Sequence, residues 1–224
     1  MKQNNDRRNG YYYLDHLPEG TGYPSVTTIV KILAKPELIY WIKKETAQEA
    51  IRTLDLQKAI AYTDGIMRKA GDEGTIAHEL IENYFRGNKY DIASKPEKVQ
   101  QYLLAFEEFL KTHKPKPIEV EIVVFSDTHK YAGKVDGLFE IAGETWLIDW
   151  KSSNRIYKDA RIQIVAYKKA LEEMGRKVDK MAIVQLKNNG LPLVEMIGEN
   201  EDEVDVFDAF LSALKLYNVL DKLK

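Results

Sequence analysis

The sequence predicts an α/β protein in which a mixed β-sheet flanked by helices follows a mainly helical N-terminal portion. Helical spacing of apolar residues dominates the segment from Ser25 to about Leu110. Short runs rich in β-branched and aromatic residues then alternate with turn signals. A helical segment interrupts these runs after the third, and another follows the last run.

The helical portion carries its own start and stop signals. Pro36 suits the first turn of a helix, where a missing backbone N–H costs nothing, and residues 41–53 are rich in helix formers. Residues 99–111 have the spacing of an amphipathic helix. Pro115 and Pro117 then end this portion and introduce the sheet.

Five strands are expected in the sheet. Gly143 marks the turn after the second strand, and Asn188-Asn189-Gly190 is a strong turn signal after the fourth. The expected strand ranges are 118–125, 131–141, 145–151, 181–186 and 191–197.

Two further helices complete the pattern. Asp159 can cap a helix that runs through Met174 and stops at Gly175. The last helix is expected over residues 202–223, with one apolar stripe facing the core. That stripe contains Val204, Phe207, Phe210, Leu211, Leu214 and Leu220.

The length of 224 residues is enough to bury a sizeable core in one domain. We expect a polar N-terminal segment over 1–22 and a single domain over 23–224. Within that domain, a mainly helical part (23–116) precedes the sheet core (117–198) and a C-terminal helix (199–224).

Composition excludes several classes of protein. The formal net charge is −2, which argues against a generally basic nucleic-acid coat protein. The chain has no cysteine, so disulfides and thiolate metal sites are excluded. The start is polar and no apolar run approaches about 18 residues, so neither a signal peptide nor a membrane span is expected. A cytoplasmic protein of a bacterium, or of a phage acting inside one, is the simplest expectation.

The hairpin expected over 131–151 carries the clearest chemical signal. Side chains two apart on a strand point to the same face, so Asp149 and Lys151 share a face while Trp150 points away. If Ile141 pairs with Trp146, Leu138 faces Asp149 and Asp136 faces Lys151, so that both carboxylates and the ammonium lie on one surface.

The apolar residues of the hairpin favour this arrangement. They are Val135, Phe139, Ile141, Trp146, Ile148 and Trp150, and all are expected on the opposite face. A slip by one residue would bury Asp136 among them, at a cost of several kcal/mol for an unpaired charge.

Two more segments fit the same site. Residues 71–82 are expected to be a loop running into a helix, with Thr75 or a neighbouring polar residue as the cap and His78 in the first turns. Gln163 and Tyr167 are four apart on the predicted helix, hence on one face, where an amide and a phenol suit contacts to a phosphate or a base.

Taken singly, each of these residues has an ordinary structural explanation. His78 alone is more typical of a solvent-facing or hydrogen-bonded helix histidine. Asp136 before a glycine is typical of a turn. Asp149 and Lys151 could form a same-face salt bridge. Their order along the chain is what favours a site.

The ordered set of His78, Asp136, Asp149-x-Lys151 and Gln163-x-x-x-Tyr167 resembles the RecB-like branch of the PD-(D/E)xK nuclease superfamily. It is most similar to the small phage and mitochondrial genome maintenance exonuclease types, without the iron–sulfur cysteines of some relatives. Residues 23–41 also resemble the N-terminal region of phage members. The resemblance implies a restriction-endonuclease-like fold.

The resemblance implies a divalent metal, Mg²⁺ or Mn²⁺, held by His78, Asp136, Asp149 and the backbone carbonyl of Trp150. It places Lys151 near the attacking water and the scissile phosphate, where its charge would stabilise the phosphoryl oxygens. Catalytic roles are thus expected for Asp136, Asp149 and Lys151, and DNA contacts for Gln163 and Tyr167. Glu121, on the neighbouring strand, is expected either to support the metal or to be a plain polar residue at a strand start.

The resulting functional expectation is a metal-dependent DNA exonuclease in phage or bacterial replication, recombination or repair. Its expected partner is DNA with a free single-stranded end, together with a possible helicase or recombinase and no membrane. The alternative is a catalytically silent nuclease-fold subunit that binds DNA in a recombination complex. No ATP-binding loop of the Gly-x-x-x-x-Gly-Lys-Ser/Thr type is present, so the chain carries no helicase motor of its own.

Overall fold

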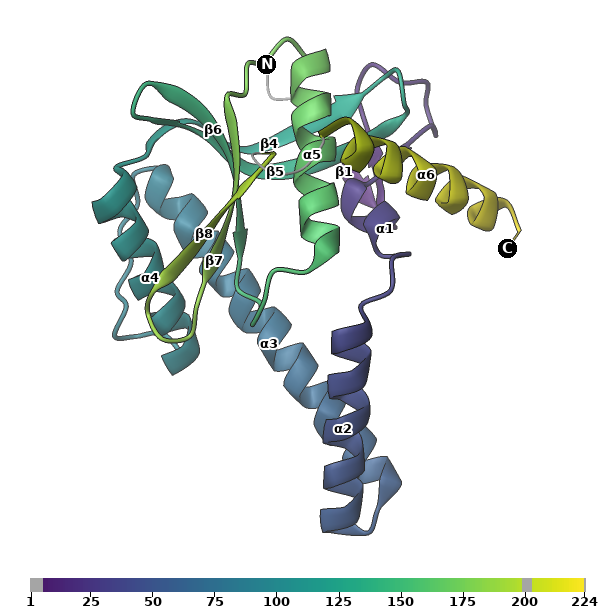
Figure 1. Cartoon of the computed structure of the whole chain (residues 1–224), viewed down its shortest axis with the longest axis vertical. Helices are drawn as coiled ribbons and strands as arrows, with labels where there is room; N and C mark the ends of the chain where they lie inside the picture. The colour runs from purple at the N-terminus through teal and green to yellow at the C-terminus, as the bar shows by residue number, and fades with distance from the viewer. Residues whose placement is uncertain (1–5, 199–202, 224) are drawn as a thin grey trace.

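The computed structural model describes residues 6–198 and 203–223 of the chain. Figure 1 shows a twisted sheet with helices on both faces and a pair of helices projecting from the body. The helices are α1 (Val26–Val30), α2 (Pro36–Thr53), α3 (Leu56–Phe85), α4 (Glu97–His113), α5 (Lys158–Glu173) and α6 (Glu203–Lys222). Within these ranges no helix is long and apolar enough to cross a membrane.

The predicted mixed sheet is confirmed. Its five strands lie in the order β4 (Lys116–Ser126), β5 (Tyr131–Ile141), β6 (Glu144–Lys151), β7 (Lys180–Leu186) and β8 (Pro192–Ile197). Only the β6–β7 pair is parallel, and α5 is the crossover between those two strands. The other three pairs are antiparallel.

Two apolar cores lie on the two faces of this sheet. One core joins α1, α5 and α6 to the sheet, with Tyr131, Leu147, Ile164 and Phe210 among its buried members. The other joins α3 and α4 to the opposite face and contains Trp150, which contacts the rings of aromatic residues from both helices. Strand β6 is thus covered on both sides.

The segment expected to be a polar N-terminus contributes a second, smaller sheet. Strands β1 (Asp6–Arg8) and β2 (Tyr11–Tyr13) pair with β3 (Tyr23–Pro24), and Ser25 bridges to Ala132 of β5. This small sheet therefore lies against the main one. By contrast, α2 has no buried residue, and with the first half of α3 it forms the projecting pair seen in Figure 1.

The expectation of a loop before His78 was wrong. Helix α3 runs without interruption for 30 residues, and its N-cap is Asp55, whose side chain accepts a hydrogen bond from Lys58 N. Thr75 caps nothing, because its hydroxyl donates to the carbonyl of Gly71 one turn earlier. Gly71 and Gly74 disfavour a helix too weakly to interrupt α3, which is long and packs against α2 and α4.

The predicted N-cap of α5 was wrong, and the predicted apolar stripe of α6 was partly correct. Tyr157, not Asp159, is the N-cap of α5, and Asp159 lies in the first turn, where its carboxylate pairs with Lys35 at 2.7 Å. In α6, Phe210 and Leu214 are buried as expected, but Val204 and Leu220 are exposed. Asp202, the expected first residue of that helix, lies outside the described residues.

The register of the β5–β6 hairpin differs by two residues from the expected one. Phe139 pairs with Trp146, Leu138 with Leu147, and Ile141 with Glu144. The turn is the two-residue Ala142-Gly143, with φ of 51° and 84°, which matches the twist of a hairpin better than the expected three-residue turn. A shift by two does not by itself move any side chain to the other face, so Asp149 and Lys151 still lie side by side.

One residue of the hairpin does change face. Val135 belongs to the core on the α5 side, not to the α3 side that was expected for it. The regular alternation of β5 is lost around Asp136, where the ladder to β4 skips the Glu121–Asp136 position. Glu121 has a positive φ of 56°, which marks the irregularity in the partner strand.

Candidate active site

Asp136 lies where β5 loses its partners on both sides. The ladder to β4 skips Asp136, and the ladder to β6 ends at the neighbouring Gly137–Ile148 pair. Its carboxylate takes over one of the missing bonds, because Oδ2 accepts a hydrogen bond of 2.7 Å from the backbone N–H of Trp150. Asp136 thereby fixes the distance between the two strands at the point where they separate.

Asp149 and Lys151 share the α5 face of β6, as the alternation of the strand predicted. The Lys151 ammonium lies 2.7 Å from Asp149 Oδ2, and Asp149 is buried while Lys151 is partly exposed. Trp150 points the other way, with its indole in the core between α3 and α4. The same-face salt bridge is therefore present, and it sits beside Asp136.

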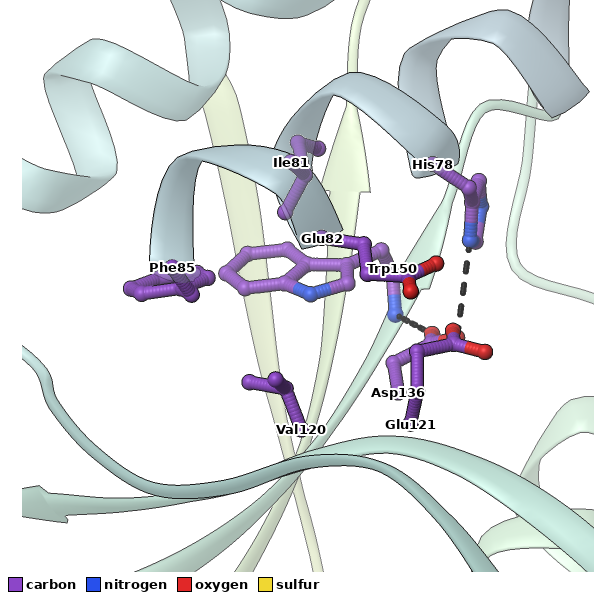
Figure 2. A pocket seen from close by; sticks show the side chains of 8 residues that line it. All are labelled: His78, Ile81, Glu82, Phe85, Val120, Glu121, Asp136 and Trp150. Carbon is purple, nitrogen blue, oxygen red and sulfur yellow. Dashed lines mark hydrogen bonds and ion pairs between the residues drawn. The ribbon is translucent and has the colours of Figure 1, made fainter. Parts of the chain in front are cut away.

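His78 comes from the C-terminal third of α3 and completes the group. Its Nδ1 lies 3.5 Å from Asp136 Oδ1, as the dashed line in Figure 2 marks. Burial by itself lowers the pKa of His78, but the Asp136 carboxylate outweighs this and raises it above its ordinary value. Residues far apart in the sequence thus meet over one strand end.

Gln163 and Tyr167 are buried behind Asp149. The Gln163 amide Nε2 donates to Asp149 Oδ1 at 3.3 Å and to the Tyr167 hydroxyl at 3.0 Å. Only 8% of Gln163 and 1% of Tyr167 is exposed. In this arrangement the pair orients the carboxylate from the protein side, and their contact with DNA stays a prediction.

Glu121 lines a small cavity together with His78 and Asp136. The cavity holds about 10 Å³, which is room for roughly one water molecule. Figure 2 shows the carboxylates of Glu82, Glu121 and Asp136 turned toward the same space. Glu121 also pairs with Lys134, while burial raises its pKa.

The two central carboxylates have different electrostatic surroundings. Burial raises the pKa of Asp149, and the charge of Lys151 offsets this only in part. Burial acts in the same direction on Asp136, but His78, Lys151 and the Trp150 N–H lower its pKa overall. Asp149 therefore carries the less compensated negative charge of the two.

The donor set fits a hard divalent cation. Two carboxylates, an imidazole nitrogen and a backbone carbonyl are ligands that Mg²⁺ and Mn²⁺ accept. Asp149 Oδ2 is buried and accepts no hydrogen bond of good geometry within the described residues, although Lys151 contacts it. In residues 6–198 and 203–223, however, no three His, Asp or Glu side chains already have the spacing that would hold a metal ion, and Asp149 faces Lys151 while Asp136 faces His78.

Two supporting contacts were missed in the sequence. Gln185 on β7 is 3% exposed, and its amide donates to the Ser153 carbonyl at 2.6 Å, which fixes the loop after Lys151. A glutamine within the apolar run 181–186 was the signal that could have identified it. Gly74 on α3 allows the same loop to approach, because a Cβ there would collide with the Ser152 hydroxyl.

Two solved structures are similar to the chain over part of its length. A putative exonuclease from Eubacterium rectale superposes with a TM-score of 0.43 and 12% identity, covering 64% of this chain and 64% of that chain. An alkaline exonuclease from Laribacter hongkongensis superposes with a TM-score of 0.36 and 16% identity, covering 66% of this chain and 93% of that chain. Neither similarity assigns a function here, and no curated protein sequence matches the chain.

The match to a family model is more extensive. The model of the PD-(D/E)XK nuclease superfamily covers residues 45–223, which include His78, both site carboxylates and Lys151. The five-stranded mixed sheet with helices on both faces agrees with the restriction-endonuclease-like fold that the resemblance implied. The chain belongs to the PD-(D/E)XK nuclease superfamily.

Proposed function

We propose that the chain is a metal-dependent DNA exonuclease that hydrolyses phosphodiester bonds. The observation that carries this proposal is the convergence of His78, Asp136, Asp149 and Lys151 at one strand end in a member of a nuclease superfamily. A pure DNA-binding protein gains nothing from burying two carboxylates where phosphates must approach, since like charges repel.

His78, Asp136, Asp149 and the carbonyl of Trp150 would hold the divalent ion, Mg²⁺ or Mn²⁺. When bound, such an ion lowers the pKa of a water molecule and neutralises charge on the phosphoryl oxygens. Asp136 keeps the two strands at a fixed separation through the Trp150 N–H, so the carbonyl of the same residue is held as well. Gln163 keeps one oxygen of Asp149 oriented.

Lys151 acts as a cation in this proposal. Burial by itself lowers the pKa of an ammonium, but Asp149 and Asp136 raise the pKa of Lys151 above its ordinary value. The side chain is therefore protonated at neutral pH. It stabilises negative charge on the phosphate and orients the water instead of removing its proton.

The finer parts of the proposal come from the family resemblance. They are a preference for free single-stranded ends, a role in phage or bacterial replication, recombination or repair, and action in the cytoplasm. A helicase or recombinase partner belongs to the same set of proposals.

The test is degradation of end-labelled single-stranded and double-stranded DNA in EDTA, Mg²⁺ and Mn²⁺. Asp149→Ala and Lys151→Ala are run beside the wild type, with Glu140→Gln as a control on the exposed side of β5. We expect metal-dependent cleavage that both site variants lose and the control keeps. The ladder of labelled products gives the polarity and the strand preference.

Equal DNA binding by all variants without cleavage of any substrate would reject the nuclease proposal. It would leave the alternative of a silent DNA-binding subunit. Internal cuts in circular single-stranded DNA would reject the exonuclease part alone.

A further inference from the structure

Strand β1 presents two neighbouring arginines on opposite faces. Arg8 is neutralised, because its Nε lies 2.8 Å from the Asp6 carboxylate. Arg7 meets no carboxylate within the described residues. Its guanidinium lies near hydroxyl groups instead, 3.4 Å from Ser25 Oγ and 3.3 Å from Thr27 Oγ1, and 5.8 Å from the centre of the Tyr12 ring.

Tyr12 connects Arg7 to the surroundings of the site. Arg7 lies over the Tyr12 ring, and Tyr12 packs with Ala132 of β5 in one small apolar cluster. The next residue, Gly133, lies against the Tyr167 ring, whose hydroxyl is bonded to Gln163 beside Asp149. Lys134 is two residues before Asp136 on β5, and Glu121 lines the same small cavity as Asp136. The small N-terminal sheet therefore borders the catalytic centre.

The cations nearest the site are already paired with carboxylates. Lys134 is paired with Glu121, and Lys151 with Asp149. Arg86 is likewise paired with Glu82, which lines the cavity. A strand of DNA needs cations that are not already paired, and a guanidinium held by hydroxyl groups keeps a donor face that fits phosphate oxygens.

We propose that Arg7 binds a phosphodiester group of the DNA strand. This group lies next to the phosphodiester group that is cleaved on the same strand. The inference rests on the proposed function and extends it, because it assigns the small sheet β1–β3 to substrate binding. The ligand is a nucleic-acid phosphate, and Tyr12 with the hydroxyls of Ser25 and Thr27 holds the guanidinium in position.

The test compares Arg7→Gln with Arg8→Gln, its neighbour on the opposite face, in the full-length protein. Binding of a fluorescently labelled single-stranded oligonucleotide is measured in EDTA over a series of salt concentrations. We expect Arg7→Gln to weaken binding about tenfold, since a hydrogen bond to a charged group is lost. The slope of log K against log salt should fall by about 0.7, the value for one phosphate on a single strand.

The controls separate binding from folding. Arg8→Gln should keep both the affinity and the slope of the wild type, and Arg7→Lys should keep the slope because it retains the charge. In cleavage assays, Arg7→Gln should raise KM with little change in kcat. Thermal unfolding of each variant reports any loss of the contacts to Ser25 and Thr27.

Two results would overturn the inference, and they differ in what they leave standing. If Arg7→Gln lowers the melting temperature but has the salt slope of Arg8→Gln, Arg7 has only a structural role and the nuclease function stands. If the wild type neither binds nor cleaves DNA, both the inference and the proposed function fail.

Discussion

The two ends of the β5–β6 hairpin are built on different principles. Near the turn, residues from Gly137 to Ile141 pair in regular order with residues of β6, and backbone hydrogen bonds hold the strands together. At the other end the ladder stops, and the Asp136 carboxylate accepts the Trp150 N–H in place of a backbone carbonyl. One end is held by the backbone and the other by a side chain.

This difference shows how a sheet can provide a charged site. A continuous ladder would fill the space between strands with backbone groups, leaving none for a metal or a phosphate. The end of the ladder leaves that space free of backbone pairing, and the partly buried Asp136 carboxylate accepts a hydrogen bond from the Trp150 N–H that is left over. We therefore expect the turn end to contribute mainly to stability and, under the proposed function, the open end to carry the chemistry.

The largest expected effect is the loss of activity in Asp136→Asn at the open end. The amide oxygen can still accept the Trp150 N–H, so the fold should be kept while the negative charge is lost. Cleavage should fall about a thousandfold or more. Glu140→Gln, on the same strand near the turn and paired with Lys116, is the control and should cleave like the wild type. Equal activity of both variants would contradict the division between the two ends.

Phe139→Ala should have the converse effect near the turn. Phe139 is fully buried and contacts the rings of Phe85 and Trp150. We expect a loss of about 3 to 5 kcal/mol in the free energy of unfolding, measured with urea. Cleavage per folded molecule should change little. If Phe139→Ala folds stably but does not cleave DNA, the turn end of the hairpin also contributes to cleavage.

Gly133→Ala tests whether α5 positions the open end. A Cβ at Gly133 would collide with the ring of Tyr167, whose hydroxyl is bonded to Gln163 and through it to Asp149. Overpacking should cost about 1 to 3 kcal/mol of stability. Displacement of Asp149 should lower kcat about tenfold or more.

Two variants serve as controls for Gly133→Ala. Gly71→Ala, in open space on α3, should slightly stabilise the protein, because alanine is the better helix former. Replacing Tyr167 by leucine in the Gly133→Ala background should restore part of kcat if the ring is what moves Asp149. Loss of stability without any change in kcat would show that α5 packs against the sheet but does not position Asp149.

The smallest expected effect is a gain of stability at the turn. Ala142 has a positive φ of 51°, a conformation that asparagine adopts more readily than alanine, and Gly143 follows it. Ala142→Asn should stabilise the fold by about 1 kcal/mol or less without altering cleavage. Thermal unfolding and the DNA cleavage assay together check this prediction. A change in cleavage would show that the turn of the hairpin affects the site at its open end.

Local signals predicted most of the elements of the fold. Pro36 begins α2, Gly143 lies in the hairpin turn, and Gly175 follows α5. Each of these residues acts on the backbone within a few positions of itself, so its influence on the fold can be predicted from the sequence alone. The alternation of side chains along β6 likewise put Asp149 and Lys151 on one face and Trp150 on the other.

Errors arose where distant contacts decide the result. The glycines at 71 and 74 look like a loop, yet tertiary packing keeps α3 helical, and Gly74 serves a close approach to Ser152. The pairing register was two residues off because the apolar pattern repeats every two residues and cannot distinguish such shifts. The burial of Gln163 and Tyr167 by α5 against the sheet was likewise not predicted, while their contact with DNA stays a prediction.

The sequence by itself thus determined the order of the strands of the main sheet, the face of every apolar hairpin residue except Val135, and the choice of His78, Asp136, Asp149 and Lys151 as one set. Tertiary structure alone decided where the β5 ladder breaks and which groups compensate for that break. Alternation and turn chemistry are short-range effects, whereas the break depends on strands and helices that are far apart along the chain. Only their packing brings the two carboxylates, the imidazole and the ammonium to one strand end.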